Sequence, residues 1–190
     1  MTRTLTVVEA ERFARKAHTG HTRNNRANTP YEYHLEEVAT LVHESHGSPE
    51  EIAAAWLHDS VEDTTTTLAD IHDLLGPTVA SIVEHLTDLP EWKGLPTLER
   101  KTLQAARVAT LVHTHSVGIL PARIKRVKLA DQISNVRCCT LDPPVKWDAA
   151  KIRHYIEGAR RIALVCRGIS NYLDDTFENE YRAAYAARIF

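Results

Sequence analysis

Glycine and proline are scarce in this chain of 190 residues, which holds 7 Gly and 8 Pro. Because these residues form most tight turns, their scarcity argues against many short hairpin-linked strands and favours long helices. Cysteine is scarce as well, and Cys138, Cys139 and Cys166 form neither a disulfide framework nor a CxxC metal pair. We interpret all three as core thiols, since free cysteine is among the most buried residue types.

Long hydrophobic runs are also missing. No segment approaches the roughly 18 apolar residues of a membrane span, and residues 1–12 become charged before a signal-peptide core accumulates. We therefore expect a cytoplasmic protein with no membrane partner. The 43% of hydrophobic and 25% of charged residues are typical of globular proteins and exclude a disordered chain. The length predicts a single domain over residues 1–190.

Basic residues are absent from the middle of the chain. Residues 27–92 contain no Lys or Arg but 14 Asp and Glu. Residues 1–26 hold six basic and two acidic residues, and residues 123–190 hold 13 basic and 8 acidic ones. The net charge of −2 therefore conceals an acidic middle between basic ends. Most of these side chains fit solvated helix faces, but the pattern also suits carboxylates that hold a cation beside Lys and Arg that bind phosphates.

Apolar residues recur at three-and-four spacing along most of the chain, which predicts helices. No alternating strand pattern competes, so the predicted fold class is an all-α bundle. The first predicted helix carries Val7 to Ala17, the second carries His34 to Val42 and is ended by Gly47, and the third is opened by the capping sequence Ser48 to Glu51. A short helix follows, capped by Thr66 or Thr67 and closed by Gly76, and then a helix over 77–86 and a loop over 89–96. The remaining predicted helices cover 97–116, 121–141, about 146–172 and about 174 to the C-terminus.

Chemistry-bearing side chains are concentrated after the third predicted helix. His58, Asp59, Glu62 and Asp63 lie within six positions. If the helix continues through Asp63, His58 shares a face with Glu62, and Asp59 shares one with Asp63. Carboxylates crowded on one turn repel and call for a cation or a raised pKa. The segment therefore predicts a metal site, although a lone His-Asp pair is common on surface helices.

Two further side chains extend this set to four ligands. His34 lies at the start of a predicted helix, and Asp131 is the lone acidic residue of a basic, apolar one, where a carboxylate needs a partner. Taken singly, each also fits an ordinary surface or hydrogen-bonded role. Two imidazoles and two carboxylates together suit manganese or iron(II) better than a closed structural zinc site.

Three segments, in their order and spacing, closely resemble the hydrolase domain of the RelA/SpoT homologue family, the HD-superfamily domain that degrades guanosine tetra- and pentaphosphate alarmones. These segments are TPYEYH at 29–34, LHDSVEDT at 57–64 and VKLADQISNVR at 127–137. The resemblance runs from about residue 5 to about residue 172, and it includes LERK at 98–101 and Tyr155. It is greatest to the stand-alone small alarmone hydrolases of metazoan type, called SpoT homologue 1.

The resemblance implies an HD-domain helical bundle that removes pyrophosphate from the ribose 3′ position of guanosine 3′,5′-bis(diphosphate), leaving GDP or GTP. It implies one Mn²⁺ held by His34, His58, Asp59 and Asp131. Glu62 and Asp63 match the family's catalytic pair. Residues that match nucleotide or phosphate contacts are Arg23, Lys101, Asn135, Lys151 and Tyr155. We expect the helices from about residue 146 to pack on this domain, no synthetase domain, and no stable nucleic-acid partner; whether the chain forms a homo-oligomer stays open.

Some positions depart from the family pattern. The family usually has Arg-Lys and then Gly before Thr-Pro-Tyr, where this chain has Arg23-Asn24 and Asn28, so one phosphate-binding lysine is missing; Leu35 replaces the usual proline. Another HD phosphohydrolase activity, on a nucleotide such as NADPH, is therefore an alternative. A second alternative is a nucleic-acid-binding face; the basic residues that would form it are Arg123, Lys125, Arg126, Lys128 and Arg137.

Overall fold

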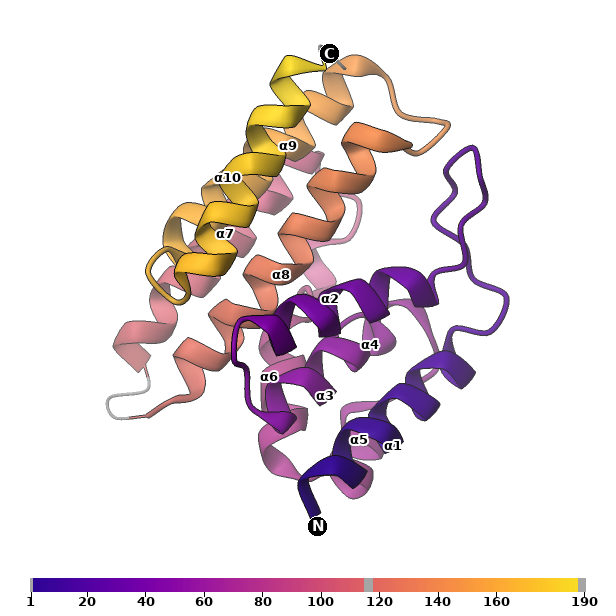
Figure 1. The fold of residues 1–190 in the computed structure, drawn as a ribbon, viewed down its shortest axis with the longest axis vertical. Coiled ribbons are helices and arrows are strands. Elements are labelled where there is room, and N and C mark those ends of the chain that lie inside the picture. The colour runs from indigo at the N-terminus through magenta and orange to yellow at the C-terminus, as the bar shows by residue number, and fades with distance from the viewer. Residues whose placement is uncertain (1, 115–117, 188–190) are drawn as a thin grey trace.

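The computed structural model describes residues 2–114 and 118–187, and Figure 1 shows their arrangement. Within those ranges every regular element is a helix, which confirms the predicted all-α fold class. None of these helices is long and apolar enough to cross a membrane. The elements are α1 (Thr2–Ala17), α2 (Glu32–Glu44), α3 (Pro49–Leu57), α4 (Ser60–Asp63), α5 (Leu68–Leu75), α6 (Pro77–Leu86), η1 (Pro90–Trp92), α7 (Thr97–Thr114), α8 (Leu120–Leu141), α9 (Ala149–Cys166) and α10 (Asn171–Ala186).

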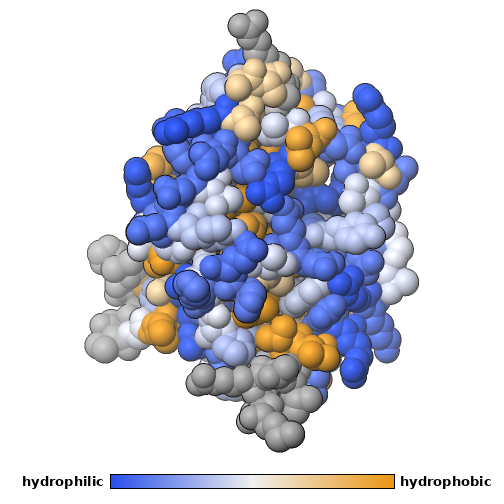
Figure 2. Space-filling view, in the orientation of Figure 1, coloured by the Kyte–Doolittle hydropathy of each residue, from blue (hydrophilic) through white to orange (hydrophobic). Residues whose placement is uncertain are grey.

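Helix α8 runs through the middle of the molecule (Figure 1). Helices α2, α3 and α6 pack on one side of it, and α7, α9 and α10 pack on the other. Its buried residues therefore point in all directions, and they include Ile124, Leu129 and Ile133 in the apolar core. The same helix also buries polar side chains, and this is where the candidate site lies. Figure 2 shows that the outer surface in this view is mainly hydrophilic, with hydrophobic residues in small separate groups.

Two predicted helix starts are confirmed by their caps. The Ser48 hydroxyl accepts a hydrogen bond from the Glu51 backbone, and the Glu51 carboxylate accepts one from the Ser48 backbone N–H at 2.8 Å. Thr67, rather than Thr66, forms the same reciprocal box with Asp70. Such caps satisfy N–H groups that a helix leaves without partners in its first turn. The predicted helix over 77–86 is confirmed, and a single 3₁₀ turn, Pro90–Trp92, interrupts the predicted loop over 89–96.

The end of α2 differs from the prediction. The helix ends at Glu44, and His46, not Gly47, takes the left-handed conformation, with φ of 60°. Gly47 is needed for a different reason. A Cβ there would lie 2.5 Å from Val42 Cγ1 and 2.8 Å from the Val42 carbonyl oxygen, so only glycine allows this close approach.

The predicted boundaries of the last helices were also wrong by several residues. Helix α9 begins at Ala149, where the Asp148 side chain accepts a hydrogen bond from the Lys151 backbone, and it ends at Cys166. Helix α10 begins at Asn171, capped by the Ser170 hydroxyl. Serine and aspartate N-caps of this kind fix where a helix starts, a position that apolar periodicity does not reveal. Residues 115–116 of the predicted helix over 97–116, and residues 188–190 of the last predicted helix, lie outside the described ranges.

Candidate active site

Four side chains from three parts of the fold meet at the centre of the bundle. His34 comes from α2, His58 and Asp59 from the junction of α3 and α4, and Asp131 from α8. The two histidine Nε2 atoms lie 3.2 Å apart. Asp59 Oδ2 lies 3.1 Å from His58 Nε2 and 3.5 Å from His34 Nε2, and Asp131 Oδ1 lies 3.8 and 3.7 Å from the same two atoms. The structure therefore brings together all four predicted ligands.

A break in the helix makes this convergence feasible. The helix does not continue through Asp63, which was the condition for the shared faces considered from the sequence: α3 ends at Leu57, and a separate single turn, α4, starts at Ser60. Adjacent side chains on a regular helix point about 100° apart, so His58 and Asp59 would diverge. Asp59 instead has φ of −101° and ψ of −2°, in the bridge region where many active-site residues occur. Both side chains therefore face the same point.

The hydrogen bonds of the two imidazoles fix which nitrogen faces the site. His58 Nδ1 lies 2.7 Å from the Ala55 carbonyl oxygen, which only accepts, so Nδ1 carries the hydrogen. His34 Nδ1 lies 2.8 Å from the Ser134 hydroxyl oxygen. Burial, and then the charge of Arg23, lower the pKa of His34, which favours its neutral form. Burial opposes the charged form of His58, but Asp59 and Asp131 raise its pKa well above the ordinary value, so the carboxylates favour a positive charge at its Nε2 atom, which a bound metal ion would supply in place of a proton.

Two imidazole Nε2 atoms and two carboxylates that face one another call for a cation between them. Two ligand atoms about 2.1 Å from a single ion and at right angles to it are about 3 Å apart, close to the shorter separations among these atoms. Within the part of the chain that the structure describes, the ligand atoms of His34, His58 and Asp59 lie close enough together to hold one metal ion. Burial opposes the charged form of Asp131, but Lys128 and His58 hold its pKa below the usual range, so it is an anion. The four residues therefore fit a divalent metal ion.

Glu62 and Asp63 lie on α4, one turn beyond the cluster. Glu62 Oε1 accepts a hydrogen bond of 2.7 Å from the backbone N–H of Asp88. Partial desolvation by the surrounding protein, and then the charges of Asp59 and Asp88, raise the pKa of Glu62 to about 7. The side chain nevertheless stays open to solvent. Partial desolvation, and then the charge of Asp59, also raise the pKa of Asp63. A carboxylate with a pKa near neutrality suits proton transfer.

Arg23 and Asn135, predicted to contact the nucleotide, are hydrogen-bonded to each other, and Asn135 is also hydrogen-bonded to one of the four predicted ligands. The Arg23 guanidinium donates to Asn135 Oδ1 at 2.6 Å, and Asn135 Nδ2 donates to Asp131 Oδ1 at 2.5 Å. Arg23 comes from the segment between α1 and α2, which reaches the far end of α8 (Figure 1). These contacts hold the Arg23 guanidinium beside the carboxylates, and the spacing of the residues in the sequence did not predict them.

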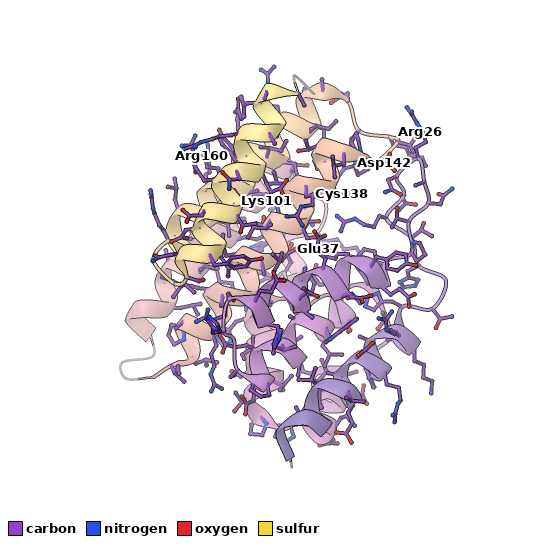
Figure 3. The ribbon with its side chains drawn as sticks, in the orientation of Figure 1. Arg26, Glu37, Lys101, Cys138, Asp142 and Arg160 are labelled. Atoms are coloured by element: carbon purple, nitrogen blue, oxygen red, sulfur yellow. The ribbon has the colours of Figure 1, made fainter. Side chains whose placement is uncertain are left out.

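Lys101 and Tyr155, the next two predicted contacts, lie behind Asp131. The Lys101 ammonium donates to Gln132 Oε1 at 2.7 Å and lies 4.2 Å from the centre of the Tyr155 ring. Gln132 Nε2 in turn donates to Asp131 Oδ2 at 2.7 Å. Burial lowers the pKa of Lys101 to about 7. Lys101 is buried on α7, next to Gly158 of α9, and Figure 3 labels it near α8.

Lys151 lies apart from this network. It is exposed on α9, with its ammonium 4.8 Å from the centre of the Trp147 ring. Trp147 lines a cavity of about 490 Å³ together with Arg23, Asn24, Asn28, Pro144, Val145 and Lys146. Lys151 is therefore close to the rim of this cavity rather than to the four ligands, and sequence reasoning overlooked Trp147.

The two asparagines that replace family residues have a structural role. Asn24 and Asn28 adopt positive φ angles of 56° and 49°, which asparagine tolerates better than most residues. The loop that they shape is tied to the end of α8, where Asp142 accepts hydrogen bonds from the backbone of Arg26 and Ala27. Figure 3 shows Arg26 and Asp142 together at this edge, and the Arg26 side chain is exposed.

The basic residues of α8 do not form one exposed face. Arg126 pairs with Glu51 at 2.9 Å, Lys128 is buried 3.5 Å from Asp131, and Arg137 pairs with Glu37 and Glu180. Acidic partners neutralise these cations within the protein, which argues against a nucleic-acid-binding surface.

Other polar residues at the site were also not assigned a role from the sequence. Tyr31 donates a hydrogen bond of 2.6 Å to Asp59 Oδ2, and His18 stacks on the Tyr31 ring at 5.2 Å. Ser134 and Gln132 contact ligands, as described above. A signal for the α8 residues was present, because a polar residue inside an apolar helix needs a partner, but the sequence does not name that partner.

Comparisons with known proteins give a consistent result. The HD domain family model matches residues 10–156. The chain is 32% identical over 177 residues to guanosine-3′,5′-bis(diphosphate) 3′-pyrophosphohydrolase MESH1 of Danio rerio, covering 92% of each chain. It is 32% identical over 178 residues to the human protein of that name, covering 93% of each. A solved structure described as "A metazoan ortholog of SpoT hydrolyzes ppGpp and plays a role in starvation responses" superposes with a TM-score of 0.80 at 28% identity, covering 93% of this chain and 94% of that one.

Proposed function

The chain belongs to the HD domain family, and from this premise we propose that it hydrolyses guanosine 3′,5′-bis(diphosphate) and its pentaphosphate form to GDP or GTP and pyrophosphate, using Mn²⁺. The observation that carries the proposal is the convergence of His34, His58, Asp59 and Asp131, with Nε2 atoms 3.2 Å apart. The names of the relatives at 32% identity supply the substrate class.

Manganese fits the donor set because two imidazoles and two carboxylates mix nitrogen and oxygen ligands without a thiolate. When bound, a divalent ion supplies Lewis-acid stabilisation of phosphoryl oxygens and acidifies water. His34 and His58 would offer their Nε2 atoms to the ion, while Asp59 and Asp131 would balance its positive charge. Tyr31 holds Asp59 Oδ2 through its hydroxyl, which fixes the orientation of that carboxylate.

The chemical step moves one proton from water to the protein. Water adds to the phosphorus bonded to the ribose 3′ oxygen, the bond between that phosphorus and oxygen breaks, and the ribose oxygen takes up a proton. Glu62 is the base in this proposal: Asp88 holds its Oε1 atom, and its other oxygen accepts the proton of the water. A pKa of about 7 keeps it largely ionised just above neutral pH. Asp63 is the acid in this proposal and returns a proton to the leaving oxygen, and its raised pKa supports this role.

Cations beside the ligands neutralise the charge of the diphosphate. Arg23 lies one hydrogen bond from Asn135, and Asn135 lies one hydrogen bond from Asp131. Lys101 is linked to the same aspartate through Gln132. A guanidinium and an ammonium in a largely desolvated site stabilise a developing phosphate anion more strongly than they would in water. The cavity beside Arg23 and Trp147 is a candidate site for the rest of the nucleotide.

The test is a product assay with Mn²⁺ and two substrates, guanosine 3′,5′-bis(diphosphate) and NADPH. We expect pyrophosphate and GDP from the first substrate, and a rate at least tenfold lower with the second. Glu62→Gln is expected to abolish most of the activity, and Glu84→Gln, at an exposed position on α6, serves as its matched control. Release of orthophosphate from NADPH with the first substrate intact would refute the proposal and favour the alternative phosphohydrolase.

A further inference from the structure

A chain of hydrogen bonds and ion pairs leads from the ligand His34 to the C-terminal helix α10. His34 Nδ1 lies 2.8 Å from Ser134 Oγ, and both side chains are buried, with 2% and 1% of their surface exposed. Ser134 Oγ lies 2.5 Å from Glu37 Oε2. The other oxygen of Glu37 pairs with Arg137, and Arg137 also pairs with Glu180 of α10 at 2.8 Å.

The hydrogen atoms in this series of contacts have only one consistent arrangement. The Glu37 carboxylate has no hydrogen to give and pairs with Arg137 through Oε1, so Ser134 donates its single hydroxyl hydrogen to Glu37 Oε2. The Ser134 oxygen must then accept from His34 Nδ1. His34 thus carries its hydrogen on Nδ1 and has a bare Nε2 atom.

The two histidine ligands are therefore supported differently. His58 donates to a backbone carbonyl, whereas His34 donates to a hydroxyl that is polarised by a carboxylate. A carboxylate that accepts the hydrogen bond of a metal-binding imidazole, here through one serine, raises the basicity of the ring and fixes its orientation. Figure 3 shows Glu37 at the place where α2 meets α8.

We propose that Ser134 and Glu37 are positioning residues that strengthen metal binding by His34, and that Arg137 and Glu180 fix Glu37 in this role. Helix α10 lies beyond residues 10–156, the segment that matches the HD domain model. The C-terminal helix thereby contributes to a metal centre whose ligands all lie within that segment. The inference rests on the proposed function only in requiring that the site binds a divalent ion.

Titration of the metal-free protein with Mn²⁺ tests this inference, with the electron paramagnetic resonance signal of free Mn²⁺ as the readout. Ser134→Ala is expected to weaken binding by about 10- to 100-fold, the usual effect of losing an outer-shell partner. Glu37→Gln is expected to weaken binding in the same direction. Because Glu37 acts through Ser134, the double variant should bind no more weakly than Ser134→Ala alone.

Three further variants sharpen the result. Glu180→Gln should lower the Mn²⁺ affinity less than Glu37→Gln does, since Glu180 is one contact further from His34. Ser134→Thr keeps the hydroxyl and should retain most of the affinity. Glu36→Gln is the matched control, because Glu36 is exposed on α2 and pairs with Arg15 at the surface, away from Ser134 and Arg137. Glu37 is half-buried, so its variant is expected to fold even if Ser134→Ala does not.

The outcomes separate this inference from the proposed function. Unchanged Mn²⁺ affinity in Glu37→Gln, additive losses in the double variant, or no Mn²⁺ binding by the wild-type protein would each overturn the inference. A wild-type protein that binds Mn²⁺ in the expected order of variants but leaves the alarmone intact would support the inference and refute the proposed activity.

Discussion

Lys101→Met is expected to raise stability and abolish most of the activity. The Lys101 side chain is 3% exposed, and within the described residues its ammonium contacts an amide oxygen and an aromatic ring rather than a carboxylate. Burial lowers its pKa from 10.5 to about 7. Each pKa unit corresponds to about 1.4 kcal/mol, so keeping the charged form at this position costs about 5 kcal/mol.

The variant also loses favourable contacts. Removing the ammonium leaves Gln132 Oε1 without its donor, which costs about 1–3 kcal/mol. The interaction with the Tyr155 ring is worth about 1 kcal/mol. Subtracting these losses from the cost of burying the charge leaves a gain of about 2 kcal/mol in the free energy of unfolding at pH 7. This gain corresponds to a rise of about 4–8 °C in Tm for a chain of this size.

The pH dependence gives an independent check. The pKa of Lys101 in the folded state lies below its value in the unfolded chain, so the unfolded chain binds more protons between about pH 7 and pH 10.5. The stability of the wild-type protein should therefore rise with pH in this window, and the advantage of Lys101→Met should shrink. Calorimetric melts at pH 7 and pH 9 measure this, with Lys16→Met, at an exposed position on α1, as the control.

Activity distinguishes a functional lysine from a structural one. Loss of the buried cation should lower kcat/KM for guanosine 3′,5′-bis(diphosphate) by about 10²- to 10³-fold, as expected for a group that stabilises charge in the transition state. A variant that is less stable than the wild type by 2 kcal/mol or more, yet keeps its kcat/KM, would refute this reasoning.

Four further outcomes follow from the same geometry. Glu62→Gln should lower kcat by about 10²- to 10⁴-fold with Mn²⁺ affinity unchanged, and full turnover would contradict its role as base. Because the surrounding protein, Asp59 and Asp88 raise the pKa of Glu62 to about 7, and only the ionised form accepts a proton, kcat should rise with pH through neutrality; a flat profile argues against it. Gly158→Ala should lower Tm, because its Cβ would lie 2.5 Å from Lys101 Cβ, and overpacking of about 1–3 kcal/mol outweighs about 1 kcal/mol of helix propensity; a higher Tm would contradict this. Chelation should also lower Tm, because a ligand at 100 times its Kd stabilises by about 2.7 kcal/mol, and an unchanged melt in chelator would argue against a resident ion.

Much of the fold was predictable because local signals determine it. The capping sequence at Ser48 and the turn signals at Gly76 and Pro77 fixed helix starts that the structure confirms. The boundary between α9 and α10 was misplaced, because apolar residues continue past Cys166 while the chain turns at Gly168 and restarts at Ser170. Periodicity reports which face is buried, and it is less informative about where a helix stops.

The site was predicted as a set of residues but not as a geometry. The sequence supplied His34, His58, Asp59 and Asp131 from three distant segments, and the structure brings their donor atoms together. The break after Leu57 was not predictable, since the residues around it continue a helical pattern. The partners of the ligands are long-range contacts, such as the one between Ser134 and His34, and such contacts are specified only when the helices pack.

Product analysis in water labelled with heavy oxygen tests the central claim most directly. The purified protein is incubated with Mn²⁺ and guanosine 3′,5′-bis(diphosphate), and the products are weighed by mass spectrometry. Attack of water on the phosphorus next to the ribose predicts label in the pyrophosphate and none in the GDP. Intact nucleotide, orthophosphate as the product, or label on the ribose oxygen of GDP would contradict the account.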